Sequence, residues 1–273
     1  MRKDRREQGS ILVLTFVVMA TLTAIVSSFL YMNSTQTLGI GYDVPDSRAQ
    51  WLAEAGIQKA IWNLKTPAGS GGQGESWTTA GTTENLGSGS YTMVVTRYDF
   101  ALAANGATAS DSPAQTDSSI GPAKAIDGND ATYWESRDKP VANNPQDLII
   151  AFPYTLRINK VRFLAASSNA RPKDYTWEVS ADGVTYTTVV NGNNNNNTDV
   201  TDTFTTQDNV NYLKLSTTKI GSGNTGVRIA TLEAIGSKIT STGTAGSSSR
   251  QVIQTAVADD ATQTAAEEID WDQ

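Results

Sequence analysis

The first pattern in the chain is an uninterrupted apolar run from Ile11 to Met32, which follows a basic segment at residues 1–9. The run contains no charged residue. Its roughly 22 residues, at about 1.5 Å per residue, are enough to cross a hydrocarbon core of about 30 Å. A secretory signal peptide is the competing interpretation, but its apolar region is shorter. We therefore expect a membrane-crossing helix whose basic flank stays cytoplasmic, with the rest of the chain beyond the inner membrane.

A second helical pattern occupies residues 46–65. Before it, Gly39, Gly41 and Pro45 each weaken or kink a helix, so we expect an interruption there. Apolar side chains then recur at spacings of three and four, which places them on one helix face. This stripe consists of Ala49, Leu52, Ala53, Gly56, Ile57, Ala60, Ile61 and Leu64. Because such a face must be buried, we expect it to pack on a small sheet formed by later sequence.

Short strand patterns separated by turn residues follow the helical part. A strand is predicted at 91–98 after a Gly-, Ser- and Thr-rich surface loop at 67–89, and a hairpin at 238–257. Between them, several short strands with turn signals are typical of an antiparallel β-sandwich. They lie at 148–152, 156–164, 175–180, 185–190, 202–205, 212–216 and 227–235. The Asp182-Gly183 pair predicts a hairpin turn, and the acidic tail at 259–273 is expected to be disordered.

Composition excludes several kinds of chemistry. The net charge of -7 argues against nucleic acid as a partner, because phosphate binding needs clustered Lys and Arg. The chain has no cysteine and no histidine, which excludes Ser-His-Asp and Cys-His catalysis and zinc-thiolate sites. No paired carboxylates lie in a recognisable catalytic motif, so we do not expect an enzyme. A hard cation such as calcium is the metal that this composition can still hold.

Two segments carry a resemblance in the N-terminal part. Residues 7–14 (EQGSILVL) resemble the basic leader and Gly-ending cleavage site of type IV prepilins, and residues 51–57 (WLAEAGI) resemble the helix motif of the PilX and GspK-like minor pilins. The resemblance implies cleavage after Gly9 by a prepilin peptidase, methylation of the new N-terminus at Ser10, and a long helix packed with other pilins in a filament. It divides the chain into a leader (1–9), a transmembrane helix (10–32), a pilin helix, loop and first strand (33–98) and a sheet hairpin (238–258).

The residue at position 14 departs from the pattern of major pilins. Most of them have Glu at the fifth mature position, where it pairs with a neighbour's terminal ammonium, and here that residue is Leu14. An unpaired charge in an apolar filament core is costly, and a subunit with Leu14 has no carboxylate to pair with a neighbour's terminal ammonium. The resemblance therefore implies a minor subunit or pseudopilin that initiates or caps a filament. An ordinary single-span anchor is the alternative.

A second resemblance covers residues 99–237. Residues 122–129 (PAKAIDGN), followed by Thr132 and Trp134, are similar to the opening motif of discoidin, or F5/8 type C, domains and of family 32 carbohydrate-binding modules. In pilins a strand like 91–98 leads directly into strands like those of the hairpin, so these residues resemble an insertion. Together the two resemblances imply an α+β fold, with a long N-terminal helix on a small antiparallel sheet and an inserted all-β jelly-roll sandwich.

The discoidin resemblance implies a structural calcium ion, for which 6 to 8 oxygen ligands are typical. The alternative is a simple turn at 127–129 beside a surface charge. The implied ligands are the backbone carbonyls of Lys124, Thr132 and Leu232 and side-chain oxygens of Asp127, Asn129, Thr132 and Glu233.

The resemblance also implies a ligand site on loops at one end of the sandwich. Asp138, Lys139, Asn169 and Arg171 are the side chains there that could hydrogen-bond sugar hydroxyls, although these loops lack an exposed aromatic platform. Trp134 is expected in the core, as are Tyr175, Trp177 and Val179, which alternate along one strand.

Three functions are compatible with these observations. The first is an adhesive minor pilin, at a filament tip, that binds a glycan or a surface protein. The second is a structural, filament-initiating pseudopilin of a type II secretion-like system whose insert is only a spacer. A secreted hydrolase subunit is the weakest. The first two imply a single-pass inner-membrane protein with a periplasmic C-terminal part, which moves to a cell-surface pilus or pseudopilus on assembly.

Overall fold

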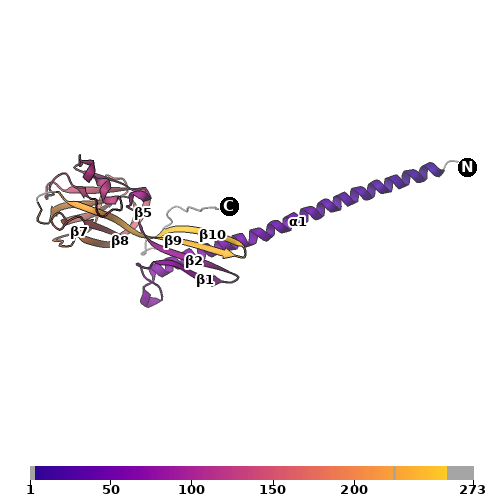
Figure 1. The fold of residues 1–273 in the computed structure, drawn as a ribbon, viewed down its shortest axis with the longest axis horizontal. Coiled ribbons are helices and arrows are strands. Elements are labelled where there is room, and N and C mark those ends of the chain that lie inside the picture. Colours follow the sequence, from indigo (N-terminus) through magenta and orange to yellow (C-terminus); the bar gives the residue numbers. More distant parts are fainter. Residues whose placement is uncertain (1–3, 224–225, 257–273) are drawn as a thin grey trace.

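The computed structural model describes residues 4–223 and 226–256, with side chains left undescribed at 4–15, 33–43 and 256. The side chains at the predicted cleavage site, Gly9 and Ser10, and the predicted tail at 259–273 therefore lie outside the described residues. The described part is an extended helix that leads into two β-rich units arranged one after the other (Figure 1).

Helix α1 runs without a break from Asp4 to Lys65 and contains Pro45. The predicted helix at 46–65 is confirmed, whereas the predicted interruption before it is wrong. Proline removes one backbone hydrogen bond, and the helix continues because the residues after Pro45 are held against a sheet. In the part of the chain that the structure describes, no helix is both long and apolar enough to cross a membrane. The segment predicted to cross the membrane, 10–32, lies partly outside the residues whose side chains are described.

The small sheet lies against the C-terminal part of α1 (Figure 1). It consists of β1 (Thr79–Leu86), β2 (Gly89–Asp99), β9 (Arg228–Ala245) and β10 (Ser248–Ala256), in the antiparallel order β1-β2-β9-β10. The predicted helix stripe forms a core with this sheet, as expected from its period. This core consists of helix and strand residues together: Ala49, Leu52, Ala53, Ile57, Ala60, Ile61, Leu64, Tyr91, Met93, Val95, Ile239, Ala245 and Val252.

Strand β1 lies within residues 67–89, where the Gly-, Ser- and Thr-rich composition predicts a surface loop instead. The strand is polar and mostly exposed, with Thr83 beside Thr92 and Glu84 beside Tyr91 of β2. An edge strand that buries no apolar face shows no alternation of apolar and polar residues, so it carries little signal in the sequence.

The second unit is an antiparallel, jelly-roll-like sandwich. Its strands are β3 (Thr108–Ser112), β4 (Trp134–Glu135), β5 (Gln146–Ala165), β6 (Pro172–Ser180), β7 (Thr187–Gly192), β8 (Asp199–Ile220) and the first part of β9. The neighbours run in the order β9-β5-β8-β6-β7, with β3 on β5 and β4 on β9. The predicted core residues Trp134, Tyr175, Trp177 and Val179 are all buried.

Two pairs of predicted short strands are joined in the structure. Strand β5 includes both 148–152 and 156–164, and β8 includes both 202–205 and 212–216. Register shifts between the two long strands mark the places where the sequence indicated breaks. Irregular pairing of this kind bends a strand without ending it.

The two units are connected through β2 and β9. The chain leaves the small sheet at Asp99 of β2 and re-enters it along β9, and Asp99 lies opposite Ile235 in the ladder. The two ends of the intervening segment therefore lie side by side, which is the geometry that makes insertion into an existing sheet inexpensive.

Candidate functional site

The loops that carry the predicted ligand residues lie at the end of the sandwich far from α1. Strand β9 begins there at Arg228 and runs toward the small sheet. The Arg228 N–H donates to the carbonyl of Ala170 (3.0 Å), and the Ala166 N–H donates to the carbonyl of Arg228 (3.1 Å). We call the segments 136–139, 167–171, 193–197 and 221–223 the distal loops.

Asn169 and Arg171 connect three of these segments. The Asn169 side-chain oxygen accepts from the Ser222 hydroxyl (2.9 Å), and its carbonyl accepts from the Gly223 N–H (3.0 Å). The Arg171 guanidinium donates to the Asn195 carbonyl (3.2 Å) and to Oδ1 of Asn196 (2.9 Å). Arg171 therefore adds two contacts to a loop that is also held by the Asn195 N–H, which donates to the Lys173 carbonyl (2.9 Å).

Asp138 and Lys139 belong to the fourth segment, which lies against the start of β9. Ser136 exchanges two hydrogen bonds with Val227, each of 2.9 Å, and its hydroxyl also donates to the Asp138 carbonyl (2.8 Å). The Asp138 N–H donates to the side chain of buried Gln146 (3.2 Å). Because Arg228 bonds to Ala170 and Val227 bonds to Ser136, the segments 167–171 and 136–139 both lie against residues 227–228, where β9 begins.

Tyr133, Glu135 and Arg228 form a further cluster beside the distal loops that sequence reasoning missed. The Arg228 guanidinium lies 5.3 Å from the centre of the Tyr133 ring and 3.0 Å from a Glu135 carboxylate oxygen. Trp134 between them is buried, so its two neighbours point the other way, as strand alternation requires. The alternation of side chains around buried Trp134 is the sequence signal that could have placed Tyr133 and Glu135 together on the outer face.

Four of the predicted calcium residues share one loop. The Asp127 carboxylate accepts from the Asn129 N–H (2.9 Å) and from the Thr132 hydroxyl (2.8 Å). The Lys124 ammonium lies 4.0 Å from Asp127. Gly128 has a φ of 77°, which lets the loop close tightly. These contacts describe a turn stabilised by its own side chains.

Glu233, the carboxylate predicted to complete the calcium site, is engaged elsewhere. Its Oε2 accepts from Arg97 of β2 and from Arg162 of β5, the latter at 3.0 Å. Leu232 has a buried side chain and pairs with Phe163. The Thr231 hydroxyl of β9 donates to Asp130 beside the predicted calcium loop.

The donor set therefore does not fit a calcium ion. Two guanidiniums neutralise the Glu233 carboxylate, and Asp127 is already the acceptor of two hydrogen bonds within its loop. Among the described residues, no group of three or more Asp, Glu, His or Cys side chains could hold a metal ion.

Arg162 joins Glu233 to a further carboxylate. Its Nε and Nη2 donate to the two oxygens of Asp199, at 2.7 and 2.9 Å. This two-pronged pairing lowers the pKa of Asp199 below its ordinary value, because the hydrogen bonds favour the charged form.

Comparison with known proteins identifies the sandwich. The family model described as F5/8 type C domain matches residues 106–232. This segment is an F5/8 type C domain. The resemblance drawn from residues 122–134 is thereby confirmed, whereas the pilin resemblance has no support in these comparisons. No curated protein matches the chain.

Several solved structures are similar to the region that contains the F5/8 type C domain. Chitosan-binding module 1 from a Paenibacillus sp. IK-5 chitosanase/glucanase is 24% identical, and the match covers 52% of this chain and 100% of that chain with a TM-score of 0.45. The family 32 module of Clostridium perfringens NanJ, in complex with galactose, is 22% identical over 51% and 99%, with a TM-score of 0.42. A Clostridium perfringens CpGH89CBM32-5 module, in complex with GalNAc-β-1,3-galactose, is 21% identical over 47% and 94%, with a TM-score of 0.40.

Proposed function

We propose that the F5/8 type C domain binds a glycan through its distal loops, and that the remainder of the chain is a minor-pilin-like stalk that presents it. The observation that carries the first half is that the distal loops meet around the start of β9, where Asn169 and Arg171 connect three of the segments and Ser136 ties the segment with Asp138 to Val227. The proposal assigns binding to this protein and no catalysis.

The chemistry of the distal loops suits a sugar. Asn169, Asn195, Asn196 and Ser222 offer both donors and acceptors, and Arg171 adds a planar cation. Groups of this kind fix the orientation of a ligand through directed hydrogen bonds. The half-exposed ring of Tyr133 is the nearest apolar surface, so the loops do not depend on a deep pocket.

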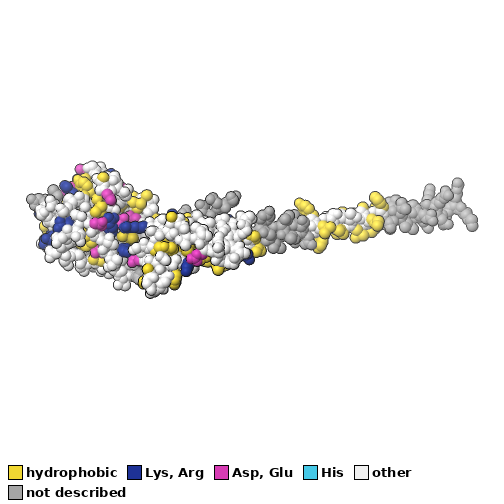
Figure 2. Space-filling model, turned by 60° about the horizontal axis from the view of Figure 1, so that its bottom comes forward, with side chains coloured by type: hydrophobic (Ala, Val, Ile, Leu, Met, Phe, Trp, Pro, Cys, Tyr) yellow, Lys and Arg dark blue, Asp and Glu magenta, His cyan; other side chains and the backbone are white. Residues whose placement is uncertain are grey.

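The stalk half of the proposal rests on the helix and on the sequence at its start. Helix α1 packs its C-terminal third on a small sheet, and its described apolar side chains from Phe16 to Met32 are exposed, with Phe16 at 74% (Figure 2). A helix that is apolar all round needs partners along its length, and neighbouring pilin helices are the partners we propose. In this scheme the F5/8 type C domain is displayed at the cell surface, at the tip of a pilus or pseudopilus.

A filament-initiating pseudopilin with a non-binding insert is the alternative. The absence of an exposed aromatic platform among the predicted loop residues favours it. The two are distinguished by whether the domain binds any sugar at all.

Binding is tested on the full chain by calorimetry with galactose, N-acetylgalactosamine and chitotriose. We expect Arg171→Ala and Asn169→Ala each to weaken binding at least tenfold, because each removes a loop contact as well as a donor. Lys124→Ala, in the calcium loop, is the matched control and should bind as the wild type does. A folded wild-type protein that binds none of these sugars would overturn the glycan function and favour the spacer.

The stalk is tested in cells by mass spectrometry of the mature N-terminus. Cleavage after Gly9 and a methyl group on Ser10 are the expected results. Restoring the glutamate with Leu14→Glu should spread the protein along filaments if the wild type is confined to a tip. Wild-type protein distributed along the whole filament would exclude the tip location.

A further inference from the structure

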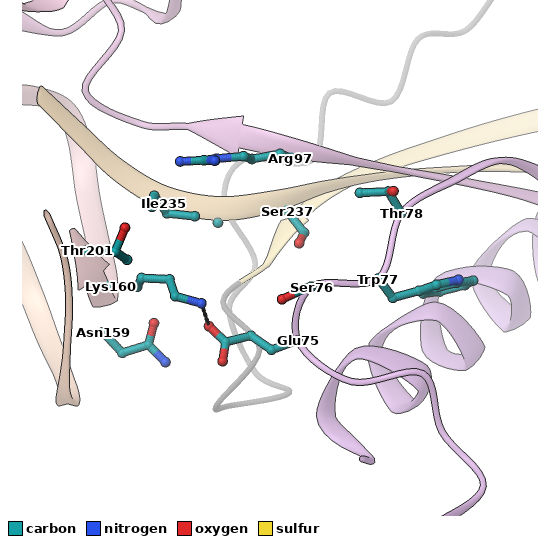
Figure 3. A pocket seen from close by; sticks show the side chains of 11 residues that line it. Glu75, Ser76, Trp77, Thr78, Arg97, Asn159, Lys160, Thr201, Ile235 and Ser237 are labelled. Atoms are coloured by element: carbon teal, nitrogen blue, oxygen red, sulfur yellow. Dashed lines mark hydrogen bonds and ion pairs between the residues drawn. The ribbon is translucent and has the colours of Figure 1, made fainter. Parts of the chain in front are cut away.

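A cavity lies at the junction between the small sheet and the F5/8 type C domain, well away from the distal loops (Figure 3). Its volume is about 290 Å³, near the lower limit of about 300 Å³ for small-molecule sites. It is lined by the loop 75–78, Arg97, Asn159, Lys160, Thr201 and residues 235–237. A neighbouring hollow of about 470 Å³ shares Glu75 and Asn159 with it. The cavity contains side chains from both units, so neither unit alone would form it.

Two polar side chains that make no hydrogen bond to another described residue line this cavity. Asn159 and Ser237 are each only 8% exposed, and neither side chain makes a hydrogen bond to any described residue. Asn159 points into the cavity in Figure 3. Their polar atoms are not among the enclosed, unpartnered ones of the described residues, so the Asn159 carboxamide and the Ser237 hydroxyl remain accessible from the cavity and free to bind a ligand.

The orientation of Asn159 follows from an irregularity in β5. Ile158 pairs with Gln207 and Lys160 with Thr203, so the register with β8 changes at Asn159. An irregularity of this kind re-aims a side chain. As a result the carboxamide faces the cavity, although the adjacent Ile158 faces the apolar core.

The charges around the cavity are already paired. Lys160 donates to Glu75, and Arg97 donates to Glu233. A charged ligand would have to displace one of these partners, whereas an uncharged one would leave both pairs intact. The remaining lining consists of the Ser76, Thr78, Thr201 and Ser237 hydroxyls, together with the apolar surfaces of Trp77 and Ile235.

We propose that this junction cavity is a second binding site, for an uncharged saccharide. The Asn159 carboxamide is suited to two adjacent sugar hydroxyls, since its oxygen accepts from one while its NH₂ donates to the other. The Ser237 and Thr201 hydroxyls, which make no hydrogen bond within the described residues, provide the next contacts. Ile235 supplies an apolar wall for the C–H face of the ring. The site is independent of the distal loops and does not rest on their function.

The experiment uses the full chain with two uncharged sugars, galactose and N-acetylgalactosamine, as probes. The side-chain N–H of Trp77 is followed by NMR after ¹⁵N-labelling of the tryptophans, with Trp77→Phe to assign its signal. We expect at least one sugar to shift the Trp77 signal in a saturable way, and to do so equally in the distal-loop variant Arg171→Ala.

Two variants test the cavity itself. Asn159→Leu removes the carboxamide at similar volume, and Thr201→Val removes an exposed hydroxyl; both should keep the wild-type Tm and weaken the Trp77 response at least tenfold. The proposal is overturned if no probe shifts the Trp77 signal, if Arg171→Ala abolishes the shift, or if both cavity variants respond as the wild type does. Because the distal site is measured separately with Arg171→Ala, failure of one site is not confused with failure of the other.

Discussion

Arg162 of β5 and Glu233 of β9 face each other with 3.0 Å between Nη1 and Oε2. The same carboxylate also binds Arg97 of β2, so one side chain connects the small sheet to the F5/8 type C domain. The Glu233 side chain is only 16% exposed, which limits screening by water. Loss of the Glu233 carboxylate should therefore destabilise the fold, and its pairing with two arginines competes with metal binding.

Glu233→Gln should lower the free energy of unfolding by about 1–3 kcal/mol, because it leaves two guanidiniums without their shared carboxylate. Urea denaturation of the two proteins measures the difference. Asp208→Asn is the matched control: Asp208 pairs with Arg157 but is 61% exposed, so the change should cost less than about 1 kcal/mol. Equal effects of the two substitutions would contradict the connecting role of Glu233.

Calcium should not stabilise this protein. A ligand that binds only the folded state raises Tm with its concentration, and here the predicted carboxylate is occupied by arginines. We expect Tm measured by circular dichroism in millimolar calcium and in excess chelator to agree within about 1 °C, since even 1 kcal/mol shifts Tm by several degrees at this domain size. A calcium-dependent rise in the wild type that Asp127→Ala removes would show that the ion binds and that Glu233 changes partners.

Asp99 should make the protein less stable as pH rises from about 4 to 7. Burial raises its pKa from 3.8 to about 7, and the nearby Glu233 charge adds to the effect; hydrogen bonds from the Ala101 and Ala234 N–H groups and the charge of Arg97 act in the opposite direction. Between these two pKa values the folded state keeps a proton that the unfolded state has lost. The free energy of unfolding therefore falls across this window, by an amount on the order of a few kcal/mol, and levels off above it.

Asp99→Asn separates this contribution from all other titrations. An amide oxygen can accept the same two N–H groups and carries no charge, so the variant should lose the downward slope between pH 4 and 7 and be more stable than the wild type at pH 8. Urea denaturation at pH 4.5, 6 and 8 provides the comparison. A variant with the same slope as the wild type would assign the pH dependence to other groups.

Gly243→Ala should loosen the packing of α1 on the small sheet. A Cβ at Gly243 would lie 2.0 Å from the Ala49 carbonyl oxygen and 2.5 Å from the Ala53 nitrogen, so helix and strand would have to separate. Overpacking of this kind costs about 1–3 kcal/mol, and thermal unfolding should show a lower Tm. Gly69→Ala is the control, because nothing lies within 4 Å of the added Cβ; a drop in Tm equal to that of Gly243→Ala would rule out the clash.

Features set by neighbouring residues could be predicted from the sequence. The helix stripe around Ile57 and the buried alternation of Tyr175 and Trp177 follow from the periods of the helix and the strand. The Asp182-Gly183 turn was also predictable, since Asp182 accepts from the Val184 and Thr185 N–H groups and Gly183 has a φ of 73°. The order of the motifs indicated which loops would carry Asn169 and Arg171.

Only the tertiary structure decided which partners distant side chains would find. The polar edge strand β1 buries too little apolar surface to show a period, and the joins within β5 and β8 depend on cross-strand register. The pairing of Glu233 with Arg97 and Arg162, and the junction cavity around Asn159, arise where strands from two units meet. A local pattern determines which face of an element is buried, whereas the partner of a charged group depends on the arrangement of the whole chain.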